Sequence, residues 1–152
     1  MPPEFSLQPV LDYRHSRVEA EQIELARLQQ AYHQGLAHLD FLEEEISLTY
    51  HQIGKMQTGN IDMDQLAQFR LRVRTLDQQI KDQKETLTTL LKQIETQRER
   101  LVLAKQEEET LVILKKKRLE TWKAEERRKE TAQRDDIYIA QAFQRSVLSA
   151  RD

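Results

Sequence analysis

The helical pattern of this chain has one strong interruption, at residues 57–62, which read Gln57-Thr58-Gly59-Asn60-Ile61-Asp62. Glycine tolerates the left-handed conformation that often follows a helix end, so we expect a positive φ at Gly59. Asp62 suits the capping position of a following helix, and Gln65 three residues later completes a capping-box spacing. The stretch therefore predicts a turn at 58–62, with one helix ending before it and another beginning after it.

Apolar residues recur every seven positions on both sides of this turn. The series before it is Leu11, Val18, Leu25, Tyr32, Leu39, Ile46 and Ile53. The series after it is Leu66, Val73, Ile80, Leu87, Ile94 and Leu101. Such a repeat is typical of helices that pair in a coiled coil, and a short turn between them makes the pair antiparallel. We predict an all-α fold: two long helices in an antiparallel coiled-coil hairpin.

The alignment of the two helices also follows from the pattern, although a slip of half a heptad stays open. Pairing residues whose numbers sum to about 122 places Gly35 opposite Leu87 and brings Arg14 to Glu108. The opposite charges of the second pair support this alignment.

Composition agrees with helices and argues against several functions. Ala, Glu, Lys, Leu and Arg make up roughly half of the chain, which is typical of long helices, while only three glycines and three prolines are present. Sheet folds need many more turn residues. The formal net charge of −2 argues against a general nucleic-acid binder.

Cysteine is absent, and the longest apolar runs have four residues, whereas a membrane-spanning helix needs about 20. No secretory signal is visible at the start. We therefore expect a cytoplasmic protein that reaches a membrane only through partners.

We treat residues 1–152 as a single coiled-coil hairpin with unequal arms. Three prolines keep residues 1–9 in an extended arm, because proline is not tolerated inside a helix. Helix 1 is predicted at 10–57 and helix 2 at 63–148. Helix 1 can pair with helix 2 only to about residue 114, so residues 115–148 are predicted to overhang without a partner at the C-terminal end.

The overhang has two distinct parts. Lys115 to Arg134 carries 9 basic and 4 acidic residues, whereas helix 1 carries 4 basic and 8 acidic residues. Further along, Ile139, Ala140, Phe143 and Val147 form an apolar stripe at helical spacing. Helix 1 is too short to reach this stripe, which favours an external partner over folding back.

The sequence predicts no enzyme, no metal site and no cofactor. The four histidines lack the i, i+3 or i, i+4 spacing that places two ligands on one helix face. No phosphate-binding or nucleophile motif occurs. The carboxylate runs Glu43–Glu45 and Glu107–Glu109 lie on helices that cannot desolvate them enough to tune a general acid.

The opening residues resemble the N-terminus of the flagellar export protein FliJ family. They read Phe5-Ser6-Leu7-Gln8-Pro9-Val10-Leu11-Asp12-Tyr13-Arg14, followed by Glu19-Ala20-Glu21 and Leu25-Ala26. The charged stretch Glu125–Glu130 leading to Asp135-Asp136-Ile137 is also similar to the family pattern. The resemblance covers nearly the whole chain.

This resemblance implies a stalk in bacterial flagellum biogenesis and motility, within type III protein export. Family members insert the end that bears both termini into the export ATPase hexamer, contact the membrane export gate and bind export chaperones. The implied location is peripheral, at the cytoplasmic face of the inner membrane, at the flagellar base. A monomer is expected.

Exposure and charge suggest which residues make these contacts. For the ATPase ring we expect the segment from Lys115 to Phe143 together with the arm, and within them Phe5, Leu7, Leu11, Lys116, Arg127, Arg128, Lys129 and Phe143. For the export gate we expect Phe41, Leu48 and Tyr50, which lie off the seam between the helices. Exposed apolar clusters mark contact sites.

Other functions fit the same pattern. The equivalent stalk of a virulence type III secretion system would have the same sequence features. A nucleic-acid-binding helical arm predicts steep salt dependence of binding. A generic scaffold coiled coil, dimeric through the overhang, is the remaining alternative.

Overall fold

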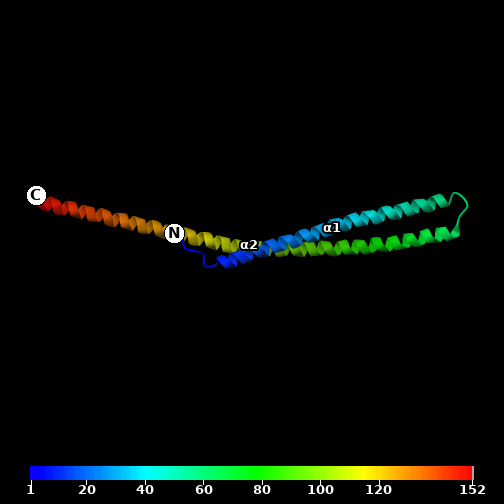
Figure 1. The fold of residues 1–152 in the computed structure, drawn as a ribbon, viewed down its shortest axis with the longest axis horizontal. Helices are drawn as coiled ribbons and strands as arrows, with labels where there is room; N and C mark the ends of the chain where they lie inside the picture. The colour runs from blue at the N-terminus through cyan, green and yellow to red at the C-terminus, as the bar shows by residue number, and fades with distance from the viewer. Residues whose placement is uncertain (152) are drawn as a thin grey trace. The chain divides into compact units, whose positions relative to one another are not determined.

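The computed structural model describes residues 1–151 and contains two helices, α1 (Gln8–Met56) and α2 (Met63–Arg151) (Figure 1). The helices pack antiparallel, with arms of 49 and 89 residues, so the predicted all-α hairpin with unequal arms is confirmed. α1 begins two residues before the predicted start, and α2 continues three residues past the predicted end.

The described residues form two compact units. The hairpin unit comprises Arg17–Ala104, and the terminal unit comprises Met1–Ser16 together with the described residues from Lys105 onward. Helix α2 contributes to both units, and α1 contributes its first turns to the terminal unit. No helix within the described range is both long enough and apolar enough to cross a membrane.

The core of the hairpin unit lies along the predicted seam. Every seam position there is buried or half-buried, and most other positions are exposed. The tightest cluster consists of Leu42, Leu76 and Ile80, with Leu39 and Ile46 packed against it. A seven-residue apolar repeat thus became a continuous interface between the helices, as coiled-coil packing requires.

One close approach of the helices fixes their alignment. A Cβ atom on Gly35 would lie 2.7 Å from Cδ2 of Leu87 and 3.1 Å from Nε2 of Gln83, so only glycine leaves room for Leu87 as it stands. The Gln83 amide donates a hydrogen bond to the Gly35 carbonyl oxygen at 3.1 Å. The predicted pairing of Gly35 with Leu87 is confirmed.

Polar residues in the seam have hydrogen-bond partners. Nε2 of Gln97 donates to the carbonyl oxygen of Glu21 at 3.1 Å and also to the Glu21 carboxylate. The Thr49 hydroxyl donates to the carbonyl oxygen of Glu45 at 2.8 Å. Throughout the described part of the chain, no buried side-chain nitrogen or oxygen lacks a partner. The seam therefore tolerates these polar groups without the cost of an unpaired one.

The turn confirms one prediction and overturns another. The Asp62 carboxylate accepts hydrogen bonds from the backbone nitrogens of Asp64 (3.1 Å) and Gln65 (3.3 Å), so Asp62 caps α2 as predicted. The positive φ predicted for Gly59 is wrong. The Thr58 hydroxyl instead donates to the Lys55 carbonyl oxygen at 2.8 Å, so a side chain satisfies the end of α1 that a left-handed glycine would otherwise satisfy.

The terminal unit begins with the first turns of α1 against α2. Leu11 is buried there, and Arg14 Nη1 lies 2.6 Å from Glu107 Oε2. The predicted partner of Arg14, Glu108, instead lies 3.3 Å from the His15 ring. Glu108 is a half-buried seam residue, whereas Glu107 is exposed beside the seam, so the long arginine side chain reaches its partner without being buried.

Candidate functional site

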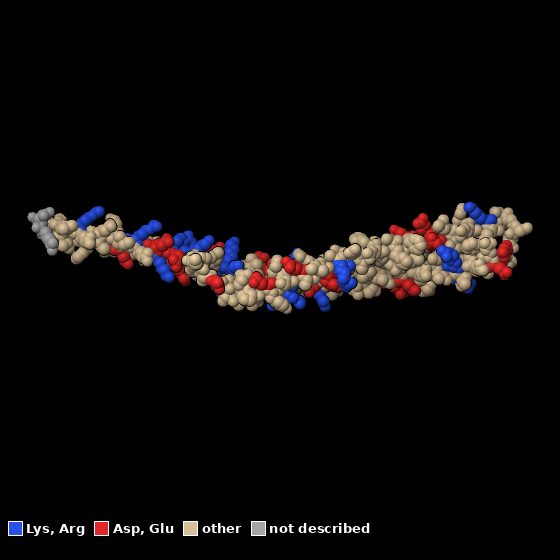
Figure 2. Space-filling view, viewed as in Figure 1, with Lys and Arg blue, Asp and Glu red and all other residues tan. Residues whose placement is uncertain are grey.

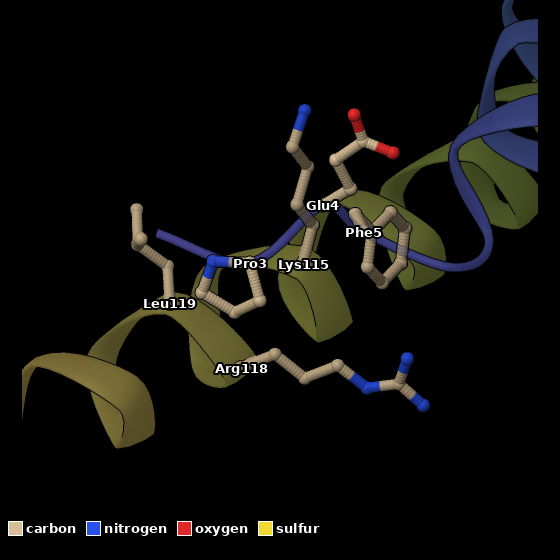
Figure 3. A pocket seen from close by; sticks show the side chains of 6 residues that line it. All are labelled: Pro3, Glu4, Phe5, Lys115, Arg118 and Leu119. Carbon is tan, nitrogen blue, oxygen red and sulfur yellow. The ribbon is translucent and has the colours of Figure 1, made fainter. Parts of the chain in front are cut away.

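The N-terminal arm lies against α2 in the terminal unit. Pro2 and Pro3 keep the first residues out of a helix, and α1 starts where the backbone nitrogen of Gln8 donates to the Phe5 carbonyl oxygen at 2.9 Å. Figure 3 shows the arm crossing α2 beside Lys115, Arg118 and Leu119. The arm therefore covers the first part of the segment for which the sequence predicted no partner.

Two cations of α2 hold the arm. The Arg118 guanidinium lies 5.4 Å from the centre of the Phe5 ring, within the range of a cation–π interaction. The same guanidinium donates to the Ser6 hydroxyl at 3.0 Å. One turn earlier, Nζ of Lys115 donates to the Gln8 side-chain oxygen at 2.8 Å.

A cavity of about 120 Å³ lies between the arm and α2. Its lining consists of Pro3, Glu4, Phe5, Lys115, Arg118 and Leu119 (Figure 3). Three of these side chains are apolar and three are charged. A space of this kind fits an apolar side chain of a partner with polar groups around it.

A second, more open groove lies where the arm ends. Met1 lines it together with five residues of α2, which are Trp122, Lys123, Glu126, Arg127 and Glu130. Trp122 and Glu126 are half-buried, whereas every described side chain of α2 from Arg127 onward is exposed. Coverage of α2 by the rest of the chain therefore ends at this groove.

The residues predicted to contact the ATPase ring all lie in the terminal unit, but their environments differ. Leu11 is buried in the seam, and Phe5 and Leu7 are half-buried. The remaining five are exposed, and they are Lys116, Arg127, Arg128, Lys129 and Phe143.

The exposed cations of this group are weakly paired. Nζ of Lys129 lies 3.7 Å from the Glu126 carboxylate, and Nε of Arg127 donates to the Lys123 carbonyl oxygen at 3.4 Å. Within residues 1–151, the side chains of Lys116 and Arg128 have no hydrogen-bond or ion-pair partner. Figure 2 shows lysine and arginine side chains along this part of α2, with aspartate and glutamate side chains among them. Lys116 and Arg128 can therefore bind a carboxylate of another molecule without giving up a partner within the described residues.

The apolar residues beyond the groove are exposed. Ile137, Tyr138, Ile139 and Phe143 retain 58%, 74%, 64% and 69% of their surface, respectively. No described residue of the chain covers them. Ile139 and Phe143 are four residues apart and share one face of α2, and exposed apolar neighbours of this kind mark contact surfaces.

The residues predicted for the export gate lie in the hairpin unit, on α1. Phe41, Leu48 and Tyr50 are all exposed, and the Phe41 ring stacks on His38 with centroids 6.3 Å apart. Phe41 and Leu48 are seven residues apart and so lie on one face of α1.

Sequence reasoning missed the residues that hold the arm, namely Ser6, Gln8, Arg118 and Leu119. A usable signal was present. Lys115, Arg118, Leu119 and Trp122 follow i, i+3, i+4, i+7 spacing, so they share one face of α2 just past the point where α1 begins.

Across the described residues, no three His, Asp or Glu side chains gather as a metal site would require. The surface offers exposed cations, an apolar strip and a small cavity, all of which suit the binding of another protein.

Comparison with known proteins supports a family assignment. Residues 3–147 match the family described as flagellar FliJ protein. No curated protein and no solved structure matched the chain. Because the match spans almost the whole chain, this protein belongs to the flagellar FliJ family, whose members are non-catalytic components of flagellar protein export.

Proposed function

We propose that the chain is the stalk of the bacterial flagellar type III export apparatus and that its terminal unit docks into the export ATPase hexamer. The observation that carries this proposal is the bare surface of α2 past the N-terminal arm. Large apolar side chains there are exposed, and the cations before them lack strong partners. A helix stabilised chiefly by packing needs a partner for such a face.

The cations on this surface indicate which residues of the ATPase ring would bind it. Arg127, Arg128 and Lys129 project in successive directions around α2, so together they can meet several surrounding subunits at once. We expect acidic loops of the ATPase to contact them. Lys116 extends this basic surface toward the arm.

The apolar residues proposed for docking have two different roles, direct contact with the ring and support of the end that enters it. Phe143 is exposed and contacts the ring directly, deeper along α2 than the cations. Phe5, Leu7 and Leu11 are half-buried or buried, so their part in docking is to shape the end of the molecule that enters the ring.

The hairpin unit supplies a separate contact with the membrane export gate. Phe41, Leu48 and Tyr50 are exposed at 55%, 53% and 57%, and aromatic residues are enriched at protein interfaces. Through this contact the chain couples the ATPase to the gate at the cytoplasmic face of the inner membrane. Binding of empty export chaperones belongs to the same role.

Charge reversal of the basic cluster tests the proposal. Arg127, Arg128 and Lys129 are changed together to glutamate, and stimulation of ATP hydrolysis by the purified flagellar export ATPase of the same bacterium is measured over a range of stalk concentrations. We expect the half-saturating concentration to rise at least about tenfold, because three attractive charges become repulsive.

A matched charge reversal in the hairpin unit serves as the control. Lys84, Lys92 and Arg100 are also exposed cations of α2, and changing them to glutamate alters the net charge equally. This variant should stimulate the ATPase normally. Unchanged stimulation by the terminal-unit variant, or equal losses in both, would refute the proposed docking surface.

A further inference from the structure

Helix α2 needs support at the position where α1 begins, because a single helix in water is only marginally stable. The arm supplies it. An extended chain advances about 3.1 Å per residue and a helix about 1.5 Å, so seven arm residues span about 14 residues of α2. This length agrees with the contacts, since Gln8 meets Lys115 while Met1 lines a groove with Trp122 and Glu130.

The contacts with the arm select one face of α2. Arg118 bonds to Ser6 of the arm, and Lys115 bonds to Gln8 at the start of α1 and lines the cavity beside the arm. Leu119 and Trp122 lie on the same face of α2. In Figure 3, Pro3 lies beside Leu119, and the Phe5 ring lies next to Lys115, on the side toward which the Arg118 guanidinium extends.

This selection divides a run of four consecutive cations, Lys115-Lys116-Lys117-Arg118, into two pairs. The outer two have partners near the N-terminus: Arg118 contacts Phe5 and Ser6 of the arm, and Lys115 bonds to Gln8 at the start of α1. In the described part of the chain, Lys116 and Lys117 have no side-chain partner and are exposed. Helical geometry turns them about 100° and 200° away from Lys115, toward solvent.

We propose that residues 1–6 form a strap, held by the contact of Phe5 with Arg118, that keeps α2 helical from Lys115 to Trp122. Lys116 and Lys117 thereby stay on the outward face of α2, where an acidic partner can bind them. The strap itself stands on contacts within the chain. The role of the outward lysines rests on the proposed function. Phe5 and Arg118 are thus positioning residues for the basic surface.

The single tryptophan of the chain allows a direct test of the strap. Trp122 lies in the groove lined by Met1, so acrylamide quenching of its fluorescence reports whether the arm is in place. In the full-length chain, Phe5→Ala and Arg118→Ala should each raise the quenching constant about twofold, because local opening exposes the indole ring. Hydrogen exchange of residues 115–122 should accelerate in the same variants.

Matched variants separate the clasp from general destabilisation. Phe41→Ala removes an exposed aromatic residue of the hairpin unit and should leave Trp122 quenching unchanged. Phe5→Tyr and Arg118→Lys keep an aromatic ring and a cation, respectively, and should retain most of the protection. In the double variant Phe5→Ala/Arg118→Ala, Trp122 should be no more exposed than in Arg118→Ala alone, since that single variant already removes the contact with Phe5 together with the hydrogen bond to Ser6.

Unchanged quenching and exchange in Phe5→Ala and Arg118→Ala would overturn the strap. The outward role of the lysines has its own readout. Lys116→Glu/Lys117→Glu should weaken ATPase stimulation while leaving Trp122 quenching unchanged. Increased quenching of Trp122 in this variant would mean that Lys116 or Lys117 also holds the arm, which contradicts the proposal.

These readouts also distinguish failure of the strap from failure of the proposed function. If the clasp variants expose Trp122 but neither lysine reversal nor reversal of Arg127, Arg128 and Lys129 changes ATPase stimulation, the strap stands and docking into the ring is refuted. If Lys116→Glu/Lys117→Glu leaves ATPase stimulation unchanged but reversal of Arg127, Arg128 and Lys129 lowers it, only the proposed role of the two lysines is refuted.

Discussion

The two units support the same helix in different ways. In the hairpin unit, α2 packs along a seam in which every position is buried or half-buried against α1. In the terminal unit, α2 packs first on the start of α1 and then on the extended arm, and past Glu126 its described side chains are all exposed. The helix pairing that stabilises the chain is therefore concentrated in the hairpin unit, and the part of α2 that no other segment covers lies in the terminal unit.

This difference shows how one chain can combine a well-packed helix pair with a surface that is available to a partner. The polar seam residues of the hairpin unit have their hydrogen bonds made within the chain. The cations Lys116 and Arg128 of the terminal unit have none among the described residues. A partner gains from binding where the chain has left groups unused, and it gains nothing from a seam that is already satisfied.

The largest expected effect is in the hairpin core. Leu42 is 4% exposed and packs on Leu76 and Ile80, so Leu42→Ala should lower the free energy of unfolding by about 2–4 kcal/mol through lost burial and a cavity. Urea unfolding followed by circular dichroism measures it. Leu48→Ala, six residues along the same helix and exposed, is the control and should change stability by less than about 0.5 kcal/mol. Equal losses would mean that the seam does not carry the stability.

The next effect contrasts two glycines of α1. Alanine is about 1 kcal/mol better than glycine inside a helix, and nothing lies within 4 Å of a Cβ at Gly54, so Gly54→Ala should stabilise the chain by about that amount. At Gly35 the new methyl group meets Leu87, which must shift. Gly35→Ala should therefore be less stable than Gly54→Ala by about 1 kcal/mol or more. Equal gains in thermal unfolding would show that the helices are farther apart at this position.

The smallest effect on stability is expected for Phe143 in the terminal unit, although its side chain is as large as those in the core. Phe143 is exposed, so Phe143→Ser should change the free energy of unfolding by less than about 0.5 kcal/mol while weakening binding to the ATPase. The same unfolding measurement compares it directly with Leu42→Ala. A loss comparable to that of Leu42→Ala would mean that Phe143 is covered in the free protein, and the contrast between the units would fail.

Much of the fold was predictable because a coiled coil is specified by a short local period. The seven-residue repeat identified the seam, and Asp62 identified the start of α2, each from residues close together in sequence. The prediction failed at Gly59 because the hydroxyl of Thr58 satisfied the end of α1 in another way. It was wrong by one residue for the partner of Arg14, because a long side chain chooses among several carboxylates within its reach.

The candidate site was less predictable, because the arm is not helical. Exposure of Arg127, Arg128 and Phe143 followed from their lying past the paired region. The docking of Phe5 under Arg118 did not follow, since no repeat extends into a proline-rich segment. Leu11 was predicted both as the first seam residue and as a contact for the ATPase ring. It is buried, which agrees with a seam residue.

The gap at Gly35 has a mechanical consequence. Some proteins respond to a signal by shifting one packed element past another by a full helical turn. Here such a slide would force Leu87 against a larger seam residue and remove the Gln83 amide from the carbonyl oxygen that it binds. The close packing and this hydrogen bond therefore oppose sliding of the two legs of the hairpin past each other.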